Sequence, residues 1–327
     1  MSEPRPAMAP AAFFRIGHLV RRPYLPAIAV CALLFLINGI LQPRTLRPES
    51  IVSDIATYLP LILLAVGQTF VVFASDIDLS VGSIVSLVNV VTVTVMAALG
   101  GDTGAILTGI AVGMTTGVIC GVFNGFCVAI LRFQPIVATF ASSIVFAGLA
   151  LWIMPQAGLP APDAFWETYG EDMAGIPFVL WVLVATFAAV GLIANLVFSR
   201  MLLAVGGQMQ SAYQSGLAVP RLRIEAYMLC GLFAALAALC LTGDTASGDP
   251  LLGAKSTLGS VAAVVLGGTA LSGGRGSALG SIFGAIILGL VGSVVFFAGV
   301  PFEYQNLVQG LIVLAALAGG VFAARRS

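Results

Sequence analysis

Long stretches without a charged side chain dominate this chain of 327 residues and limit what it can fold into. Eleven of them approach or exceed the roughly 20 residues that a membrane-spanning helix needs. These stretches are 23–43, 55–75, 79–101, 103–131, 133–162, 173–199, 201–220, 226–243, 256–274, 276–302 and 304–324. Stretch 201–220 carries several amides and hydroxyls, which are costly in lipid, so we expect a loop with a short helix there. The sequence therefore predicts an all-α integral membrane protein with about ten transmembrane helices.

The composition favours a lipid bilayer as the surroundings of the chain. Hydrophobic residues make up 59% of it and charged residues 9%, against about 25% charged residues in a soluble globular protein. A soluble fold could not hide so much apolar surface. The formal net charge is zero, so no basic face indicates binding to nucleic acid.

The distribution of cationic residues predicts the orientation, because cytoplasmic loops are enriched in Lys and Arg. With ten spans and a cytoplasmic N-terminus, eleven of these residues lie inside and three outside. The three outside are Arg44, Arg47 and Lys255. We expect a cytoplasmic segment 1–22, a polytopic membrane domain 23–324 and a cytoplasmic C-terminus 325–327. The first apolar run is too long for a cleaved signal peptide, so we expect it to remain as the first span.

Neither a metal site nor a disulfide framework is expected in this chain. The five cysteines lie in apolar stretches, where free cysteine behaves as a small hydrophobic residue. The only histidine, His18, is near the N-terminus, so no histidine lies near Cys120 and Cys127, the pair that could share a helix face. We expect no cofactor bound to the chain itself.

Glycine patterns predict close helix packing. Glycines recur at every fourth residue from Gly109 to Gly125 and again from Gly276 to Gly284. Small residues at this spacing let membrane helices approach closely, and we interpret both patterns as packing within the chain. The dipeptides Gly82-Ser83 and Gly259-Ser260 each lie at the start of an apolar run, a weak sign of the inverted repeats common in transporters.

A polar segment, 75–83, interrupts the apolar runs early in the chain. It combines Asp78 and Ser80 with a glycine. Such a segment is either a helix break that exposes polar groups to a pathway or an ordinary turn with a helix cap. We expect Asp78, Ser80 and Asn124 to lie near the route of a transported molecule, because polar groups within apolar spans usually face an interior. A helix–helix hydrogen bond is the alternative for Asn124.

Two glycine-rich segments are interpreted as turns. Segment 248–256 resembles a nucleotide-binding loop, but Ala254 stands between Gly253 and Lys255, where that motif requires the lysine directly after the glycine. We therefore expect no ATP binding by this chain. Segment 266–277 reads as a tight cytoplasmic hairpin.

The polar stretch 204–219 is a candidate contact for a force-generating partner. It is too polar to cross a membrane, and glycines at its ends permit sharp reversals around a short helix. A plain amphipathic helix on the membrane surface is the alternative. The candidate coupling residues are Gly206, Gly207, Gln208, Ala212, Tyr213 and Gly216.

These segments together resemble the permeases of the ribose-type ATP-binding cassette importers. The family's Ile-Asp-Leu-Ser-Val-Gly-Ser motif is matched over 77–83, and its late glycine-rich motif over 262–276. An Asn-Gly pair at Asn124 and a Pro-Ile-Val segment at Pro135 also fit. The coupling segment departs most, with Gln208 in place of asparagine.

The resemblance implies a bacterial inner-membrane importer that carries a monosaccharide, such as a pentose or hexose. It implies a second permease chain, identical or paralogous, and cytoplasmic ATPase subunits that bind ATP and Mg²⁺. A periplasmic binding protein would deliver the sugar, and the permease itself would be no enzyme.

Three alternatives stay open at this point. The importer could carry a polyol, nucleoside or furanose signalling molecule instead of a sugar. An ion-coupled transporter would need ionisable residues within the spans, where only Asp76 and Asp78 are candidates. An intramembrane enzyme would need a paired catalytic site, which the sequence does not suggest.

Overall fold

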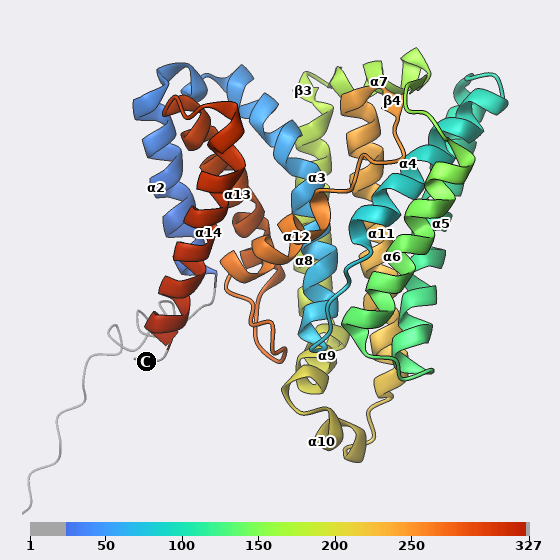
Figure 1. Ribbon diagram of the computed structural model, residues 1–327, viewed down its shortest axis with the longest axis vertical. Helices are drawn as coiled ribbons and strands as arrows, with labels where there is room; N and C mark the ends of the chain where they lie inside the picture. The colour runs from blue at the N-terminus through green and yellow to red at the C-terminus, as the bar shows by residue number, and fades with distance from the viewer. Residues whose placement is uncertain (1–23, 325–327) are drawn as a thin grey trace, which may run out of the picture.

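The computed structural model describes residues 24–324, in which most of the long apolar stretches form α-helices (Figure 1). The helices are α2 (Leu25–Leu41), η1 (Pro43–Leu46), α3 (Pro48–Phe73), α4 (Val81–Ala98), α5 (Thr103–Ala129), α6 (Pro135–Ile153), α7 (Asp163–Gly170), α8 (Phe178–Asn195), α9 (Val197–Gly207), α10 (Met209–Gln214), α11 (Val219–Thr245), α12 (Ser256–Leu266), α13 (Ala278–Phe297) and α14 (Phe302–Ala324). Two antiparallel pairs of short strands join loops: β1 (Leu159–Pro160) with β4 (Ser247–Gly248), and β2 (Asp172–Met173) with β3 (Ile176–Pro177).

Seven helices in the described part of the chain are long and apolar enough to cross a membrane, namely α3, α4, α5, α6, α8, α11 and α13. This confirms the prediction of an all-α membrane protein, although it does not establish ten spans. The first predicted span corresponds to α2, which has 17 residues, and the last to α14, which has 23. The predicted terminal segments 1–22 and 325–327 lie outside the described residues.

The predicted span 256–274 is not one helix. Helix α12 has 11 residues, which at 1.5 Å per residue covers about 16 Å, or half of a hydrocarbon core of about 30 Å. The chain then turns through Gly268, Gly273 and Gly274, which have φ values of 85°, 76° and 71°. The expected hairpin at 266–277 is therefore present, and it ends the helix earlier than the run of apolar residues suggests.

Helix α5 uses its repeated glycines for packing within the chain, as predicted. A Cβ at Gly109 would lie 2.6 Å from Met96 Cγ on α4, and one at Gly117 would lie 2.7 Å from Ala235 Cβ on α11. Gly125 is equally close to Ile224 on α11, at 2.8 Å from its Cα. The glycine row thus places α5 directly against two neighbouring helices.

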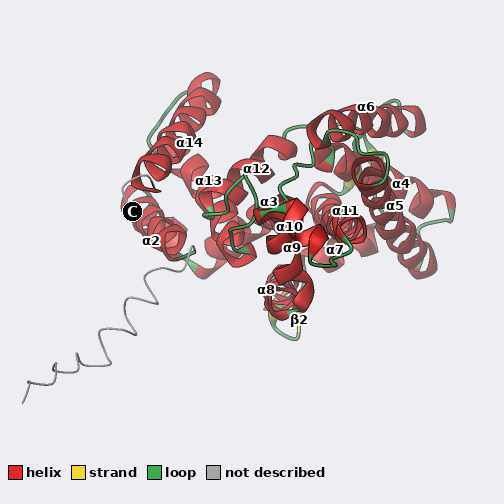
Figure 2. Cartoon of the chain, turned by 90° about the horizontal axis from the view of Figure 1, so that it is seen from below, coloured by secondary structure: helices red, strands yellow, loops and turns green. Residues whose placement is uncertain are grey.

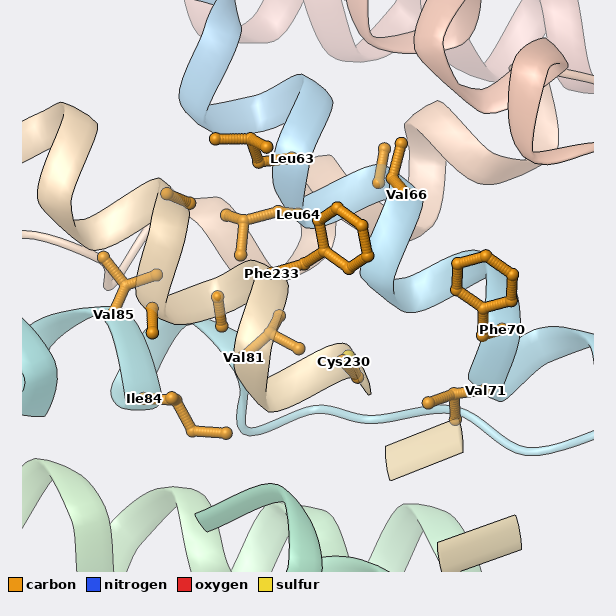
Figure 3. Packing of buried hydrophobic residues seen from close by; sticks show 14 of the residues in the cluster. Leu63, Leu64, Val66, Phe70, Val71, Val81, Ile84, Val85, Cys230 and Phe233 are labelled. Carbon is orange, nitrogen blue, oxygen red and sulfur yellow. The ribbon is translucent and has the colours of Figure 1, made fainter. Parts of the chain in front are cut away.

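The main core lies where α3, α4 and α11 meet (Figure 3). Phe70 of α3 stacks on Phe233 of α11, with ring centroids 6.4 Å apart. Val81 and Ile84 of α4 are fully buried beside them. Because lipid is as apolar as these side chains, close packing rather than escape from water holds such helices together.

The two ends of the bundle differ. Helix α7 and the short strands lie at one end, and α10 lies at the opposite end (Figure 1). Seen along the bundle, α2 and α14 lie at one side, α5 and α6 at the other, and α3, α10 and α11 between them (Figure 2). The stretch 201–220 is divided among α9, α10 and the start of α11, as expected for a segment that does not cross the membrane as one helix.

Candidate transport site

Helices α4 and α12 both begin after a non-helical segment, and their beginnings meet. The Gly82 N–H donates to Thr257 Oγ1 at 3.1 Å, and the Gly253 N–H donates to Ser86 Oγ at 3.0 Å. A Cβ on either glycine would overlap the backbone of the other. Two interrupted helices in contact are a common feature of transporter folds.

The residue in backbone contact with Gly82 is Gly253, which precedes α12. The repeat that the sequence suggests between Gly82-Ser83 and Gly259-Ser260 concerns matching positions rather than contacts, and it stays a prediction.

Asn89 of α4 anchors the non-helical segment that precedes α12. This fully buried side chain donates to Thr242 Oγ1 at 2.7 Å and to the Ser247 carbonyl at 3.1 Å. Its own Oδ1 accepts from the Asp249 N–H at 2.7 Å. The sequence analysis missed Asn89, although a polar residue inside an apolar span was the available signal.

Asp78, Ser80 and Asn124 form one buried cluster. Asp78 Oδ1 accepts from the N–H and the hydroxyl of Ser80, at 2.8 and 2.7 Å. Asn124 Nδ2 donates to Ser80 Oγ at 2.7 Å and lies 3.3 Å from Asp78 Oδ2. The three side chains are at most 1% exposed. The structure thus brings together residues that are more than 40 positions apart in sequence.

Side chains of neighbouring helices satisfy the backbone of the segment before α4. The Gln68 amide, with its nitrogen toward the Asp78 carbonyl, donates to that oxygen at 3.2 Å and accepts from the Asp78 N–H at 3.1 Å. Thr139 Oγ1 accepts from the Leu79 N–H at 3.0 Å and lies 3.2 Å from the Ile77 carbonyl oxygen. Non-helical backbone at membrane depth is tolerated only when other protein groups satisfy it in this way.

A buried ion pair lies beside this segment. Arg223 Nε and Nη2 donate to the two carboxylate oxygens of Asp76, both at 2.8 Å, and Asp76 is 3% exposed. The pair fixes the start of α11 to the interruption between α3 and α4.

Three turns meet backbone to backbone where α9 ends. A Cβ at Gly206 would overlap the carbonyl oxygen of Phe73 and lie 2.7 Å from the Gly274 nitrogen. The Gly274 N–H donates to the same Phe73 carbonyl at 3.2 Å, and Ser75 Oγ donates to the Ser272 carbonyl at 2.9 Å. The candidate coupling segment therefore touches the loops next to both interrupted helices.

The remaining coupling candidates lie on or beside α10, at the end of the bundle (Figure 1). Gln208 precedes the helix and is exposed. Tyr213 is 69% exposed, whereas Ala212 is buried under the helix. Gly216 follows it with φ of 84°. Gly207 has room beside it, since the nearest atom to an added Cβ is 4.0 Å away.

The arrangement is that of a transport permease: a bundle of apolar helices, two interrupted helices in contact, and a polar segment at one end in contact with both interruptions. A family of proteins described as "Branched-chain amino acid transport system / permease component" matches residues 50–317 of this chain. The chain belongs to this family of permease components, and it is a multi-pass protein of the bacterial inner membrane.

Curated relatives match over most of their length. The chain is 32% identical to the L-arabinose ABC transporter permease protein AraH of Azospirillum brasilense, over 96% of this chain and 92% of that protein. It is 34% identical to the ribose import permease protein RbsC of Bacillus subtilis, over 87% and 88% of the two chains. It is 30% identical to the autoinducer 2 import system permease protein LsrC of Escherichia coli, over 90% and 85%.

Proposed function

We propose that this chain is the permease subunit of an ATP-binding cassette importer that carries a monosaccharide, a pentose or hexose, delivered by a periplasmic binding protein. The observation that supports this most is the match to arabinose and ribose permeases over nearly the whole chain. The branched-chain amino acid in the family description is not the cargo of those relatives.

The partners follow from this proposal. Cytoplasmic ATPase subunits hold ATP and Mg²⁺ and supply the driving force, so the permease does no covalent chemistry. A second permease chain, identical or paralogous, completes the pore. Ten spans place both termini and α10 in the cytoplasm and α7 outside, since α7 and α10 lie at opposite ends of the bundle.

The proposed coupling route runs from the ATPase through Gly206–Val219 to the interrupted helices. Gly206 is in contact with Phe73 and Gly274, and these residues precede α4 and α13 respectively. A displacement of α9 and α10 is thereby passed to the segment that Asp78, Ser80 and Asn124 hold beside the route.

An ion-coupled mechanism has less support, because both candidate carboxylates are engaged. Asp76 is paired with Arg223, and Asp78 accepts hydrogen bonds from Ser80. The second cargo candidate is a furanose signalling molecule, suggested by the likeness to the autoinducer 2 permease.

A competition assay tests the cargo. Proteoliposomes with the complete complex should take up labelled D-ribose or L-arabinose, and unlabelled pentoses or hexoses should compete. Leucine should not compete. Competition by leucine and not by any sugar would contradict the proposal.

A further inference from the structure

A cavity of about 970 Å³ lies between α3, α12, α13 and α14. None of Asp78, Ser80 and Asn124 is among the described residues that line it. Helix α12 borders both regions, because Thr257 contacts α4 while Gly259 lines the cavity. Movement at the crossing of α4 and α12 therefore also moves one wall of the cavity.

Each of these four helices contributes a polar side chain to this cavity, while α11 contributes Leu241. The polar side chains are Thr57 and Tyr58 of α3, Ser256 of α12, Ser293 of α13, and Asn306 and Gln309 of α14. Polar groups in membrane helices usually face an interior or a water-filled space rather than lipid. Six hydroxyls and amides that converge on one space indicate a polar occupant.

The charges of the lining favour a neutral polyhydroxyl ligand. Lys255 is the only charged residue among the described lining residues, and no Asp or Glu is among them. A free amino acid would bring an ammonium group that finds no carboxylate here. Hydroxyl and amide groups both donate and accept hydrogen bonds, as the hydroxyls of a sugar require.

Tyr58 adds a fixed aromatic surface. Its hydroxyl lies 2.8 Å from Ser293 Oγ, and its ring lies against Gly289, where a Cβ would overlap the ring. Binding sites for small molecules commonly combine such aromatic walls with a few placed polar groups. The apolar face of a sugar ring can pack on Tyr58 while its hydroxyls reach the amides of α14.

The residues that line the cavity include positions near the starts of α3 and α14. Helices α3 and α14 both begin at the end where α7 lies (Figure 1). Asn306 is the fifth residue of α14, and Tyr58 is the eleventh of α3. At 1.5 Å per residue these positions lie about 6 and 15 Å from the starts of their helices. In the proposed orientation this is the outer half of the membrane.

We infer that this cavity holds the monosaccharide after the binding protein releases it, with Asn306 and Gln309 as hydrogen-bonding residues and Tyr58 as the packing surface. This inference rests on the proposed function and assigns the ligand a place within the permease.

The first test removes both amides while keeping side-chain size. Asn306→Leu with Gln309→Leu should lower uptake of D-ribose or L-arabinose by about tenfold or more, the factor expected when hydrogen bonds to a ligand are lost. Stimulation of ATP hydrolysis by the sugar-loaded binding protein should persist. The control is Thr115→Val with Thr116→Val on the exposed face of α5, whose hydroxyls bond to their own helix.

The second test fills the cavity and applies even if the double variant fails to assemble. At Gly292 the nearest atom to an added Cβ is Gln309 Nε2, at 3.9 Å, so Gly292→Ala fits. Gly292→Phe should block uptake, whereas Gly292→Ala and the size control Gly191→Phe on α8 should transport normally.

The outcomes distinguish failure of the cavity as the sugar-binding site from failure of the proposed monosaccharide import. Uptake within about twofold of wild type in both the double variant and Gly292→Phe, in a wild type that imports the sugar, would overturn the cavity as the binding site. A wild-type complex that imports none of a panel of pentoses and hexoses, D-ribose and L-arabinose included, would refute the monosaccharide as ligand and the proposed function together.

Discussion

At the scale of single residues, the cluster of Asp78, Ser80 and Asn124 stabilises the non-helical segment between α3 and α4. Asp78 accepts two hydrogen bonds from Ser80, and Asn124 completes the cluster from α5. Leaving one member of such a buried network unpaired costs about 1–3 kcal/mol. The cluster therefore holds the segment before α4 in one conformation, so that a displacement passed to it would move it as a unit.

Substitution within this cluster should impair transport more than assembly. Asn124→Ala and Asp78→Asn should each reduce sugar uptake severalfold, because the segment before α4 loses its fixed position. The complex should still purify intact. The matched control is Asn195→Ala on α8, whose exposed side chain donates to the Gly191 carbonyl of its own helix. Full uptake in both cluster variants would mean that these residues serve packing alone.

Two adjacent glycines, Gly206 and Gly207, test the contact between the end of α9 and the loops at Phe73 and Gly274. Gly206→Ala forces a methyl group against the Phe73 carbonyl, whereas Gly207→Ala has open space. Because alanine favours a helix over glycine by about 1 kcal/mol, any loss at Gly206 reflects the contact. We expect Gly206→Ala to lower uptake and sugar-stimulated ATP hydrolysis together, and Gly207→Ala to leave both unchanged. Equal behaviour of the two variants would contradict a role for this contact.

At the scale of elements, α10 is short, polar on its exposed side and anchored from below by Ala212. Its exposed side chains, among them Tyr213, have no charge, so we expect docking by shape and neutral hydrogen bonds. The helix lies at the end of the bundle, where a soluble partner can reach it (Figure 1).

A bulky residue under α10 should uncouple the permease from its ATPase subunits. Ala212→Trp replaces a side chain that is 6% exposed, so overpacking must shift the helix at a cost of about 1–3 kcal/mol. ATP binding should persist, while stimulated turnover and uptake fall together in nanodiscs. Co-elution of the ATPase reports assembly. Normal stimulated turnover and uptake would show that the segment is a passive surface loop.

Helix positions were largely predictable from apolar runs, but helix ends and partners were not. The run 256–274 suggests one span, yet the chain turns at Gly268, where backbone freedom ends α12 within an apolar sequence. The sequence indicated Asp78 and Asn124 as polar residues in apolar surroundings. It could not indicate Arg223 as the partner of Asp76, 147 positions away, because only the packing of α11 against α3 brings them together.

At the scale of the whole molecule, the two ends of the bundle carry different elements. Helix α7 lies at one end and α10 at the opposite end (Figure 1). Helix α12 connects the cavity with the crossing, because Gly259 lines the cavity and Thr257 accepts a hydrogen bond from the Gly82 N–H of α4. An importer driven from the cytoplasm requires that α10 face the ATPase and that α7 face the binding protein.

Labelling of introduced cysteines tests this orientation. On a cysteine-free background, a membrane-impermeant thiol reagent added outside should modify Asp163→Cys on α7 and not Ser211→Cys on α10. After permeabilisation both should react, which controls for accessibility. The reverse pattern would refute the ten-span arrangement with cytoplasmic termini.

The energy source of sugar uptake tests the central claim most directly. Proteoliposomes that contain this chain with its ATPase and binding protein should accumulate labelled D-ribose or L-arabinose only when ATP and Mg²⁺ reach the ATPase side. An ionophore that abolishes proton and sodium gradients should not change the rate. Uptake that continues without ATP, and stops when the ion gradient is removed, would contradict the assignment to an ATP-driven importer.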